Sequence, residues 1–181
     1  MTTCRQLVVP ILHGTKLSKE DYPKSPIEME DMSRVPYASV VGSLMYAMVC
    51  MRPDIAQVVG VLSRYMANPG RVHWDVVKRV FRYLRGTSKY CLCFQGNSSI
   101  SHPSICIRGY MDSDWATDID SRRSTSGYVF MMFGGAISWM SKWQAIAALS
   151  TTEAEYMAAT HASKEAIWLK ILCSNIDFDA G

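Results

Sequence analysis

The sequence lacks an apolar run long enough to cross a lipid bilayer. Its longest apolar run, 40–51, contains Gly42 and Ser43 and is well short of the ~20 residues that a spanning helix needs. The apolar stretch 7–12 is too short for a signal-peptide core, is broken by Pro10 and precedes no clear cleavage site. We therefore expect no membrane partner and an intracellular protein, in the cytoplasm or the nucleus, rather than a secreted one.

A disulfide framework and a strong net charge are also missing. The six cysteines are scattered over 181 residues in no tight pattern, which favours reduced thiols. A net charge of +3 is too small to identify a class of partner. Hydrophobic residues make up 49% of the chain and five residues are tryptophan, which is enough for a core in one large or two small domains.

What the sequence does contain is a strand pattern that ends in two acids. In 105–116, ICIRGYMDSDWA, alternate residues fall on opposite faces, and Asp112 and Asp114 share one of them. Two carboxylates so close on one face repel each other unless both face water or a cation lies between them. This pattern is the first indication of a metal site.

A second acidic stretch, LSTTEAEYMA, follows about forty residues later. Ser150, Thr151 or Thr152 is suited to cap the start of a helix, which places Glu153 and Glu155 in its first turn. An aspartate on a strand and a glutamate on a helix can converge. Hard oxygen ligands from separate elements are what Mg²⁺ takes, and two such ions can clamp a phosphoryl displacement.

Four motifs then occur in a characteristic order and spacing: GYMDSDWA, RRSTSGYVFMMFGGAISWMSKWQ, ALSTTEAEYMAA and KEAIWLK. Together they resemble the ribonuclease H (RNase H) domain of a copia-type LTR-retrotransposon Pol polyprotein. In that family three antiparallel strands and a helix open the fold, and four carboxylates bind two Mg²⁺ ions that cut the RNA of an RNA–DNA hybrid. The resemblance implies Asp112 as the first carboxylate and Glu155 as the second, with Asp114 and Glu153 as less favoured neighbours.

The motifs that carry the family's third and fourth carboxylates do not occur in this chain. Asp177 and Asp179 lie in NIDFDAG, which matches neither motif. With half of the ligand cage missing, we expect weak or absent Mg²⁺ binding and no hydrolysis by this chain alone. Another Pol chain or an oligomer would have to complete the site. The paired-aspartate motif of a polymerase palm does not occur upstream of Val35 either, so no polymerase activity is expected.

The same resemblance makes the region after Val35 similar to the thumb or connection of a reverse transcriptase, and its pattern is helical. We expect helices at 35–50, from Pro53 to Asn68 and at 72–85, with a short strand at 89–94. Later strands are expected at 126–133 and 136–140, joined by Gly134-Gly135, before a helix at 152–173. The predicted class is α+β, in four parts: an irregular lead-in (1–34), a helical thumb- or connection-like region (35–94), a linker (95–104) and a truncated RNase H-like domain (105–181).

Basic residues gather in the last part of the helical region. Seven lie between positions 64 and 89, against the single acid Asp75, and four of them fall on the third helix: Lys78, Arg79, Arg82 and Arg85. One interpretation is contact with the phosphate backbone of an RNA–DNA hybrid or another nucleic acid, independent of sequence and sensitive to salt. The other is a solvated face with an Asp75–Arg79 ion pair. The residues leave both interpretations open.

The same helix contains Arg82-Tyr83-Leu84-Arg85, an RxLR tetrapeptide like that of secreted oomycete effectors. A four-letter match inside a predicted helix favours coincidence, because such short patterns have a high false-positive rate. Three functions therefore remain: an inactive Pol fragment, a non-enzymatic interaction protein of an RxLR effector-like kind, and a degenerate remnant of an element.

Overall fold

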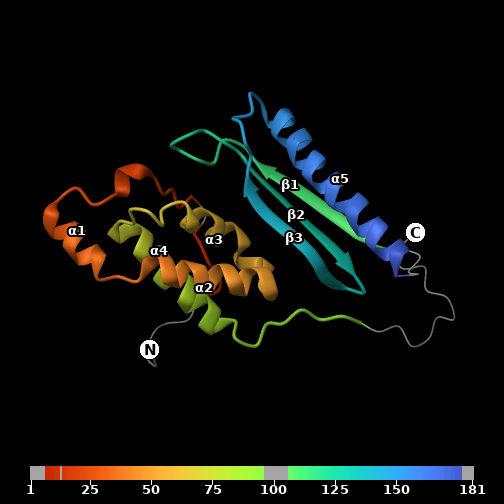
Figure 1. The fold of residues 1–181 in the computed structure, drawn as a ribbon, viewed down its shortest axis with the longest axis horizontal. Coiled ribbons are helices and arrows are strands. Elements are labelled where there is room, and N and C mark those ends of the chain that lie inside the picture. Colours follow the sequence, from red (N-terminus) through yellow and green to blue (C-terminus); the bar gives the residue numbers. More distant parts are fainter. Residues whose placement is uncertain (1–6, 13, 96–105, 177–181) are drawn as a thin grey trace. The chain divides into compact units, whose positions relative to one another are not determined.

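The computed structural model describes residues 7–12, 14–95 and 106–176 (Figure 1). These residues belong to two compact units, Met1–Cys91 and Leu92–Gly181, which we call the helical unit and the sheet unit. Helices come first along the chain, followed by three antiparallel strands and a long helix. The predicted α+β class is confirmed, and the sheet unit has the order of an incomplete RNase H-like fold. The predicted linker 95–104 lies almost wholly outside the described residues.

The lead-in is more regular than the sequence suggested. It contains a 3₁₀ turn, η1 (Lys19–Asp21), and a helix, α1 (Pro26–Ser33), so the prediction of an irregular 1–34 is wrong for these residues. The Ser25 hydroxyl accepts from Glu28 N at 3.2 Å, and the Glu28 carboxylate accepts from Ser25 N at 3.3 Å. This capping box, with Pro26 at the first helical position, starts the helix.

The helical unit continues with α2 (Tyr37–Cys50), η2 (Pro53–Ile55), α3 (Ala56–Ser63) and α4 (Arg71–Gly86). The first and third predicted helices are confirmed within two residues at each end. The second begins at Pro53 as a 3₁₀ turn and stops at Ser63, earlier than the predicted end at Asn68. Arg64 N and Tyr65 N donate to carbonyls three residues back, at 3.3 and 3.2 Å, which tightens and ends the helix.

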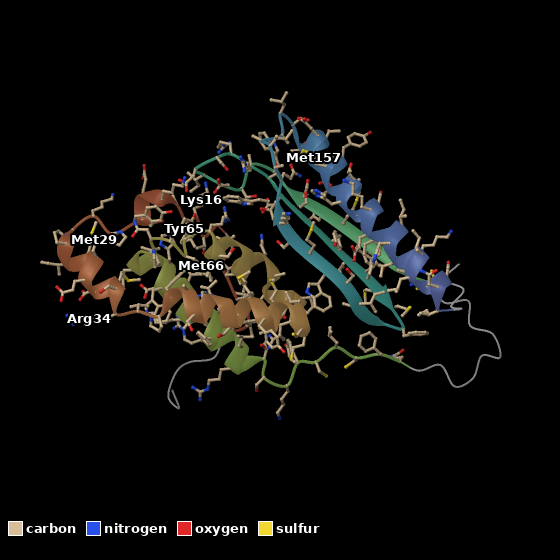
Figure 2. The ribbon with its side chains drawn as sticks, viewed as in Figure 1. Lys16, Met29, Arg34, Tyr65, Met66 and Met157 are labelled. Atoms are coloured by element: carbon tan, nitrogen blue, oxygen red, sulfur yellow. The ribbon has the colours of Figure 1, made fainter. Side chains whose placement is uncertain are left out.

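The core of the helical unit is apolar and centres on α2, α3 and α4. Its buried side chains include Tyr37, Val41, Leu44, Ile55, Val58, Val59, Leu62, Val77 and Val80. Two tyrosine hydroxyls also serve the core, because Tyr37 donates to Leu62 O at 2.9 Å and Tyr65 donates to Leu17 O at 2.8 Å. Figure 2 shows Tyr65 inside this unit, where its ring stacks on His73 with centroids 4.0 Å apart.

Two helices bury different faces from those that the sequence suggested. The helix α2 is apolar nearly all round, yet only one side is buried, and Tyr46 and Val49 on the other side are exposed. In α4 the spacing of Trp74, Val77, Phe81 and Leu84 predicts one apolar stripe. The residues that are buried are His73, Val76, Val77, Val80 and Tyr83, so the stripe is turned around the helix by about one residue.

The sheet unit holds β1 (Arg108–Asp114), β2 (Thr125–Met132) and β3 (Gly135–Trp143) in the order β1-β2-β3. The hairpin turn lies at Phe133 and Gly134, whose φ angles are 53° and 80°, one residue earlier than predicted. Gly135 already belongs to β3, and a Cβ there would meet the Phe94 ring at 2.5 Å. No strand forms at 89–94, and Gln95 N donates to Phe133 O at 2.7 Å instead.

The last helix, α5 (Thr151–Asn175), packs against β1 and β2 (Figure 1). Its buried residues include Ala154 and Ala158, whose small side chains let the helix backbone lie close to the sheet. The predicted helix at 152–173 is confirmed, with about two further residues at its C-terminal end.

Candidate metal and nucleic-acid sites

The first predicted carboxylate, Asp112, is the fifth residue of β1. Every residue of this strand except Ser113 is exposed, and in the described part of the sheet β1 pairs only with β2. Ser113 lies opposite Ser126, which is buried on the face that α5 covers. Because side chains alternate along a strand, Asp112 and Asp114 point away from that face. The Asp112 carboxylate accepts from Ser113 N at 2.9 Å.

The second predicted carboxylate, Glu155, is the fifth residue of α5 and opens its second turn rather than its first. Ser150 is the residue that caps the helix, since its hydroxyl accepts from Glu153 N at 3.1 Å. The Glu153 carboxylate in turn accepts from Leu149 N at 2.6 Å. Glu153 therefore takes part in the cap, while the half-buried Glu155 does not.

Two contacts bring the end of β1, which carries Asp112, and the start of α5, which carries Glu155, to the same end of the sheet unit. Trp115, just beyond β1, donates from Nε1 to Ala148 O at 3.2 Å, just before α5 begins. Gln144, just beyond β3, donates from Nε2 to Ala154 O at 2.9 Å. Figure 1 shows the end of β1 beside the start of α5. Asp112 precedes Trp115 by three residues, and Glu155 directly follows Ala154.

Two carboxylates suit Mg²⁺ by their chemistry, but the strand register puts Asp112 on the face of β1 away from α5, which carries Glu155, so the described residues do not turn both carboxylates toward one ion. Mg²⁺ keeps several of its waters and is usually bound through one or two carboxylates. Across residues 7–12, 14–95 and 106–176, no group of three or more His, Cys, Asp or Glu side chains is placed to hold a metal. Asp112 and Glu155 thus supply at most two ligands. Asp177 and Asp179 lie outside the described residues.

The predicted basic side chains all lie on α4. Lys78 is exposed, and Arg79, Arg82 and Arg85 are half-buried. Lys78 forms the ion pair with Asp75, so the predicted Asp75–Arg79 pair is wrong. The reason is a spacing of three residues, which brings side chains together on a helix as well as a spacing of four. Lys78, Arg82 and Arg85 follow one another at i, i+4 and i+7 and therefore share a face.

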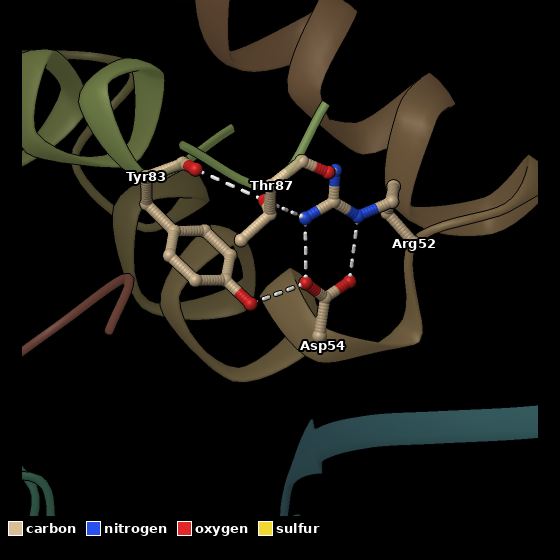
Figure 3. A network of polar contacts seen from close by, with 4 residues as sticks. All are labelled: Arg52, Asp54, Tyr83 and Thr87. Atoms are coloured by element: carbon tan, nitrogen blue, oxygen red, sulfur yellow. Dashed lines mark hydrogen bonds and ion pairs between the residues drawn. The ribbon is translucent and has the colours of Figure 1, made fainter. Parts of the chain in front are cut away.

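A buried polar network, which no local sequence pattern marks, holds the C-terminal end of α4 (Figure 3). Arg52 is 8% exposed and donates to both carboxylate oxygens of Asp54, at 2.9 and 2.7 Å. The same guanidinium donates to the Thr87 hydroxyl at 2.6 Å. Tyr83 donates to Asp54 at 2.6 Å. The turn before α3 is thereby tied to the end of α4.

Asp54 is charged in this network at neutral pH. Its burial would raise the pKa of the carboxyl, but hydrogen bonds from Arg52 and Tyr83 outweigh that effect, and the pKa lies below its usual value. The pKa of Tyr83 is raised, by burial and by its bond to Asp54. The network is thus a buried ion pair with its remaining donors and acceptors largely satisfied, which is the arrangement such pairs need.

The RxLR tetrapeptide lies entirely within α4. Tyr83 is buried in the network, and Leu84 is half-buried against the apolar core. In the described part of the chain, no helix is both long enough and apolar enough to cross a membrane.

Comparison with known proteins shows clear relatives. The chain is 54% identical over 94% of its length to the "Retrovirus-related Pol polyprotein from transposon TNT 1-94" of Nicotiana tabacum, of which it covers 12%. It is 35% identical over 97% of its length to the "Retrovirus-related Pol polyprotein from transposon RE2" of Arabidopsis thaliana, of which it covers 11%. No family model and no solved structure matches.

A third relative is of a different kind. The chain is 50% identical over 77% of its length to the "Secreted RxLR effector protein 161" of Plasmopara viticola and covers 95% of that protein. The same stretch of sequence therefore occurs both inside much longer polyproteins and as nearly the whole of a short protein.

Proposed function

This chain belongs to the retrovirus-related Pol polyproteins of copia-type LTR retrotransposons, and we propose that it joins a reverse-transcriptase thumb or connection region to the first half of an RNase H domain. The helical unit is the thumb- or connection-like part. The sheet unit is the RNase H-like part and carries the first two carboxylates of its site. The protein acts inside the cell, on an RNA–DNA hybrid or another nucleic acid.

The observation that supports this function is that the backbone segments carrying Asp112 and Glu155 lie at one end of the sheet unit, in the order of the RNase H-like fold. The contacts of Trp115 and Gln144 fix the end of β1 and the first turn of α5 relative to each other. Asp112 and Glu155 are the residues that would hold Mg²⁺. When bound, the ion would neutralise charge on a phosphodiester and lower the pKa of a bound water. The chain's own carboxylates bind and orient, and two are too few to complete the site.

The proposed role of α4 is to bind the nucleic-acid backbone. Lys78, Arg82 and Arg85 present positive charge along one face, and only Asp75 opposes it. The network of Arg52 and Asp54 holds the end of the helix that carries Arg82 and Arg85. Such contacts bind phosphates of any sequence and weaken as salt rises.

Cleavage of a labelled RNA–DNA hybrid tests the catalytic part of the proposal. The full chain is incubated with the hybrid in Mg²⁺ and in Mn²⁺, beside Asp112→Asn and Glu155→Gln. We expect no cleavage from protein that circular dichroism shows to be folded. Cleavage that both substitutions abolish would show that an oligomer completes the site, and the proposal that the chain is inactive alone would be wrong.

Salt-dependent binding tests the role of α4. Replacing Lys78, Arg82 and Arg85 by alanine should weaken binding of the hybrid. It should also make the negative slope of log affinity against log salt shallower by about 2 to 3. The matched control replaces the exposed Lys142, Lys164 and Lys170 of the sheet unit, which removes the same charge elsewhere. Equal losses from the two triple variants would reduce the effect to net charge and reject α4 as the contact surface.

A second function is favoured by one observation, the 50% identity to a protein named as a secreted RxLR effector, of which the chain covers 95%. In this alternative the fragment is a non-enzymatic interaction protein. The helical setting of the tetrapeptide argues against a flexible sorting motif. Fusing the full chain to a reporter at its C-terminus and assaying the medium distinguishes the two functions, since only the effector-like one predicts export.

A further inference from the structure

The strand β1 is one edge of the sheet, and it is far more exposed than the other edge, β3. Six of the seven residues of β1 are exposed, whereas in β3 only Lys142 is. In the described part of the sheet, β1 pairs with β2 alone. The pairing of β3 with β2 also shifts register at Phe130 and Met131, and such irregular edges pair poorly with further strands. The regular β1 edge is therefore the one that can accept another strand.

The charges of β1 complement each other when the strand is reversed. Arg108 is its first residue, Asp114 is its last, and Met111 lies midway between them. If a second β1 runs antiparallel with Met111 opposite Met111, Arg108 of each copy lies opposite Asp114 of the other. All residues of both strands are then paired. Opposite charges directly across an antiparallel pair stabilise it, and like charges destabilise it.

The same register resolves the repulsion between the two aspartates of β1. Because side chains alternate along a strand, Arg108, Asp112 and Asp114 share the face away from α5. Arg108 of one copy would lie opposite Asp114 and diagonal to Asp112 of the other, within reach of both carboxylates. Among the described residues, no ion pair involves any of these three side chains. The guanidinium of a second copy thus supplies the cation that two close carboxylates need.

The backbone groups of β1 that do not bond to β2 also fit this register. In an antiparallel strand both backbone groups of a residue point to the same side, and successive residues alternate. Ser124 O accepts from Gln144 N beyond β3 at 2.9 Å, so even-numbered residues of β2 bond toward β3 and odd-numbered ones toward β1. Odd-numbered residues of β2 lie opposite even-numbered ones of β1, as Gly127 lies opposite Asp112. The odd-numbered residues of β1 therefore face outward, and a register centred on Met111 pairs them with each other.

The helix α5 is compatible with this pairing. It packs against β1 and β2, and a two-fold axis perpendicular to the sheet puts the helices of both copies on the same face. The midlines of the two β1–β2 pairs are then two strand spacings apart, about 10 Å, which is close to the distance between packed helices. The two sheets can thus join into one continuous sheet with the two helices side by side.

We infer that β1 is a dimer interface, at which a second copy of this chain pairs antiparallel with Met111 on the two-fold axis. The interface is isologous, because both copies contribute the same residues. It depends on neither metal binding nor nucleic-acid binding. An unrelated strand would meet Arg108, Asp112 and Asp114 without matching charges, so the residues that favour a second copy also oppose other strands.

Reversing charges at exposed positions tests the interface without disturbing the core. In Arg108→Glu, and separately in Asp114→Arg, like charges meet at both ends of the pairing. We expect each variant to raise the dimer dissociation constant about tenfold or more, measured by sedimentation equilibrium of the full chain at low salt. A mixture of the two variants restores opposite charges at both ends. The mixture should therefore form a heterodimer with about the affinity of the wild-type dimer.

The matched control is Lys142→Glu, a charge reversal on the other edge of the same sheet, which should change the dissociation constant less than about twofold. A wild-type chain that stays monomeric over the whole concentration series would overturn the inference. A dimer that both β1 variants leave unchanged would place the interface elsewhere, for example on the exposed apolar residues of α5, and reject β1. If the two variants weaken the dimer but form no heterodimer, or if Lys142→Glu weakens it equally, net charge explains the loss and the proposed pairing is wrong.

Discussion

The helical unit and the sheet unit are of similar length but are held together differently. The helical unit buries large apolar side chains from three helices, among them Ile55, Val59 and Leu62. The buried apolar residues of the described sheet unit are fewer and mostly small, and Ser124, Ser126 and Gln144 are buried beside them. Apolar burial is the main source of folding free energy, whereas a buried hydrogen bond adds little net stability. The sheet unit should therefore be the less stable of the two.

The sheet unit leaves apolar side chains exposed, as α2 of the helical unit does at Tyr46 and Val49, and it also has an exposed strand edge. On the C-terminal half of α5, Ile167, Trp168 and Ile171 are each more than half exposed. The strand β1 is exposed along almost its whole length. An exposed strand edge beside exposed apolar side chains is a known liability for aggregation. This chain therefore combines a closed helical core with a sheet whose apolar surface is only partly covered.

The largest effect should come from removing a core side chain of the helical unit. Leu62 is 0% exposed, and Leu62→Ala should lower the free energy of unfolding by about 2 to 5 kcal/mol. Leu169→Ala on α5 is the matched substitution, and we expect about half that loss because exposed neighbours let the site relax. Hydrogen exchange measured by mass spectrometry, which follows the two units separately, gives both values. Equal losses would contradict the difference between the cores.

A smaller effect should follow from breaking the buried ion pair of the helical unit. Asp54→Asn leaves the Arg52 guanidinium buried without its counter-charge and should cost about 2 kcal/mol at pH 7. The pKa of Asp54 is lowered on folding, so its contribution is fully present above the ordinary value of 3.8 and is lost as pH falls through the lowered value.

Urea unfolding from pH 7 down to pH 2 therefore tests the sign of this effect. The wild type should lose stability more steeply with acid than Asp54→Asn, and the two curves should converge at the lowest pH. Parallel curves would show that Asp54 is not charged in the network, contrary to its bonds with Arg52 and Tyr83.

Elements with a clear period could be predicted from the sequence, while contacts between distant residues could not. The spacing of Ile55, Val58, Val59 and Leu62 predicts one apolar stripe, and all four are buried, because a helix repeats every 3.6 residues whatever it packs against. The bond from Arg52 to Thr87 joins positions 35 residues apart, and no local pattern marks it. The hairpin was displaced by one residue because Phe133, not Gly135, adopts a positive φ.

For the candidate site, too, the elements that carry the residues could be predicted and the contacts between distant residues could not. The sequence placed Asp112 on a strand and Glu155 near the start of a helix, and the structure has both there. Their roles as metal ligands stay predictions. Gln144 ends the motif RRSTSGYVFMMFGGAISWMSKWQ, but its burial was not predicted because a single glutamine has no period of its own and its burial depends on the pairing of β2 with β3 and the docking of α5.

The smallest effect should come from removing a helix cap. One cap in each unit can be removed, and the two losses can be compared. Ser150 caps α5, which the sheet depends on, whereas Ser25 caps α1, a short helix in which Met32 is the buried residue. Ser150→Ala should lower the stability of the sheet unit by about 1 kcal/mol, and Ser25→Ala should fray only α1. Amide exchange of each unit gives the answer. If Ser25→Ala destabilised the whole helical unit as much, α1 would have to be part of its cooperative core, and the apolar cluster of the other helices would not account for that unit's stability.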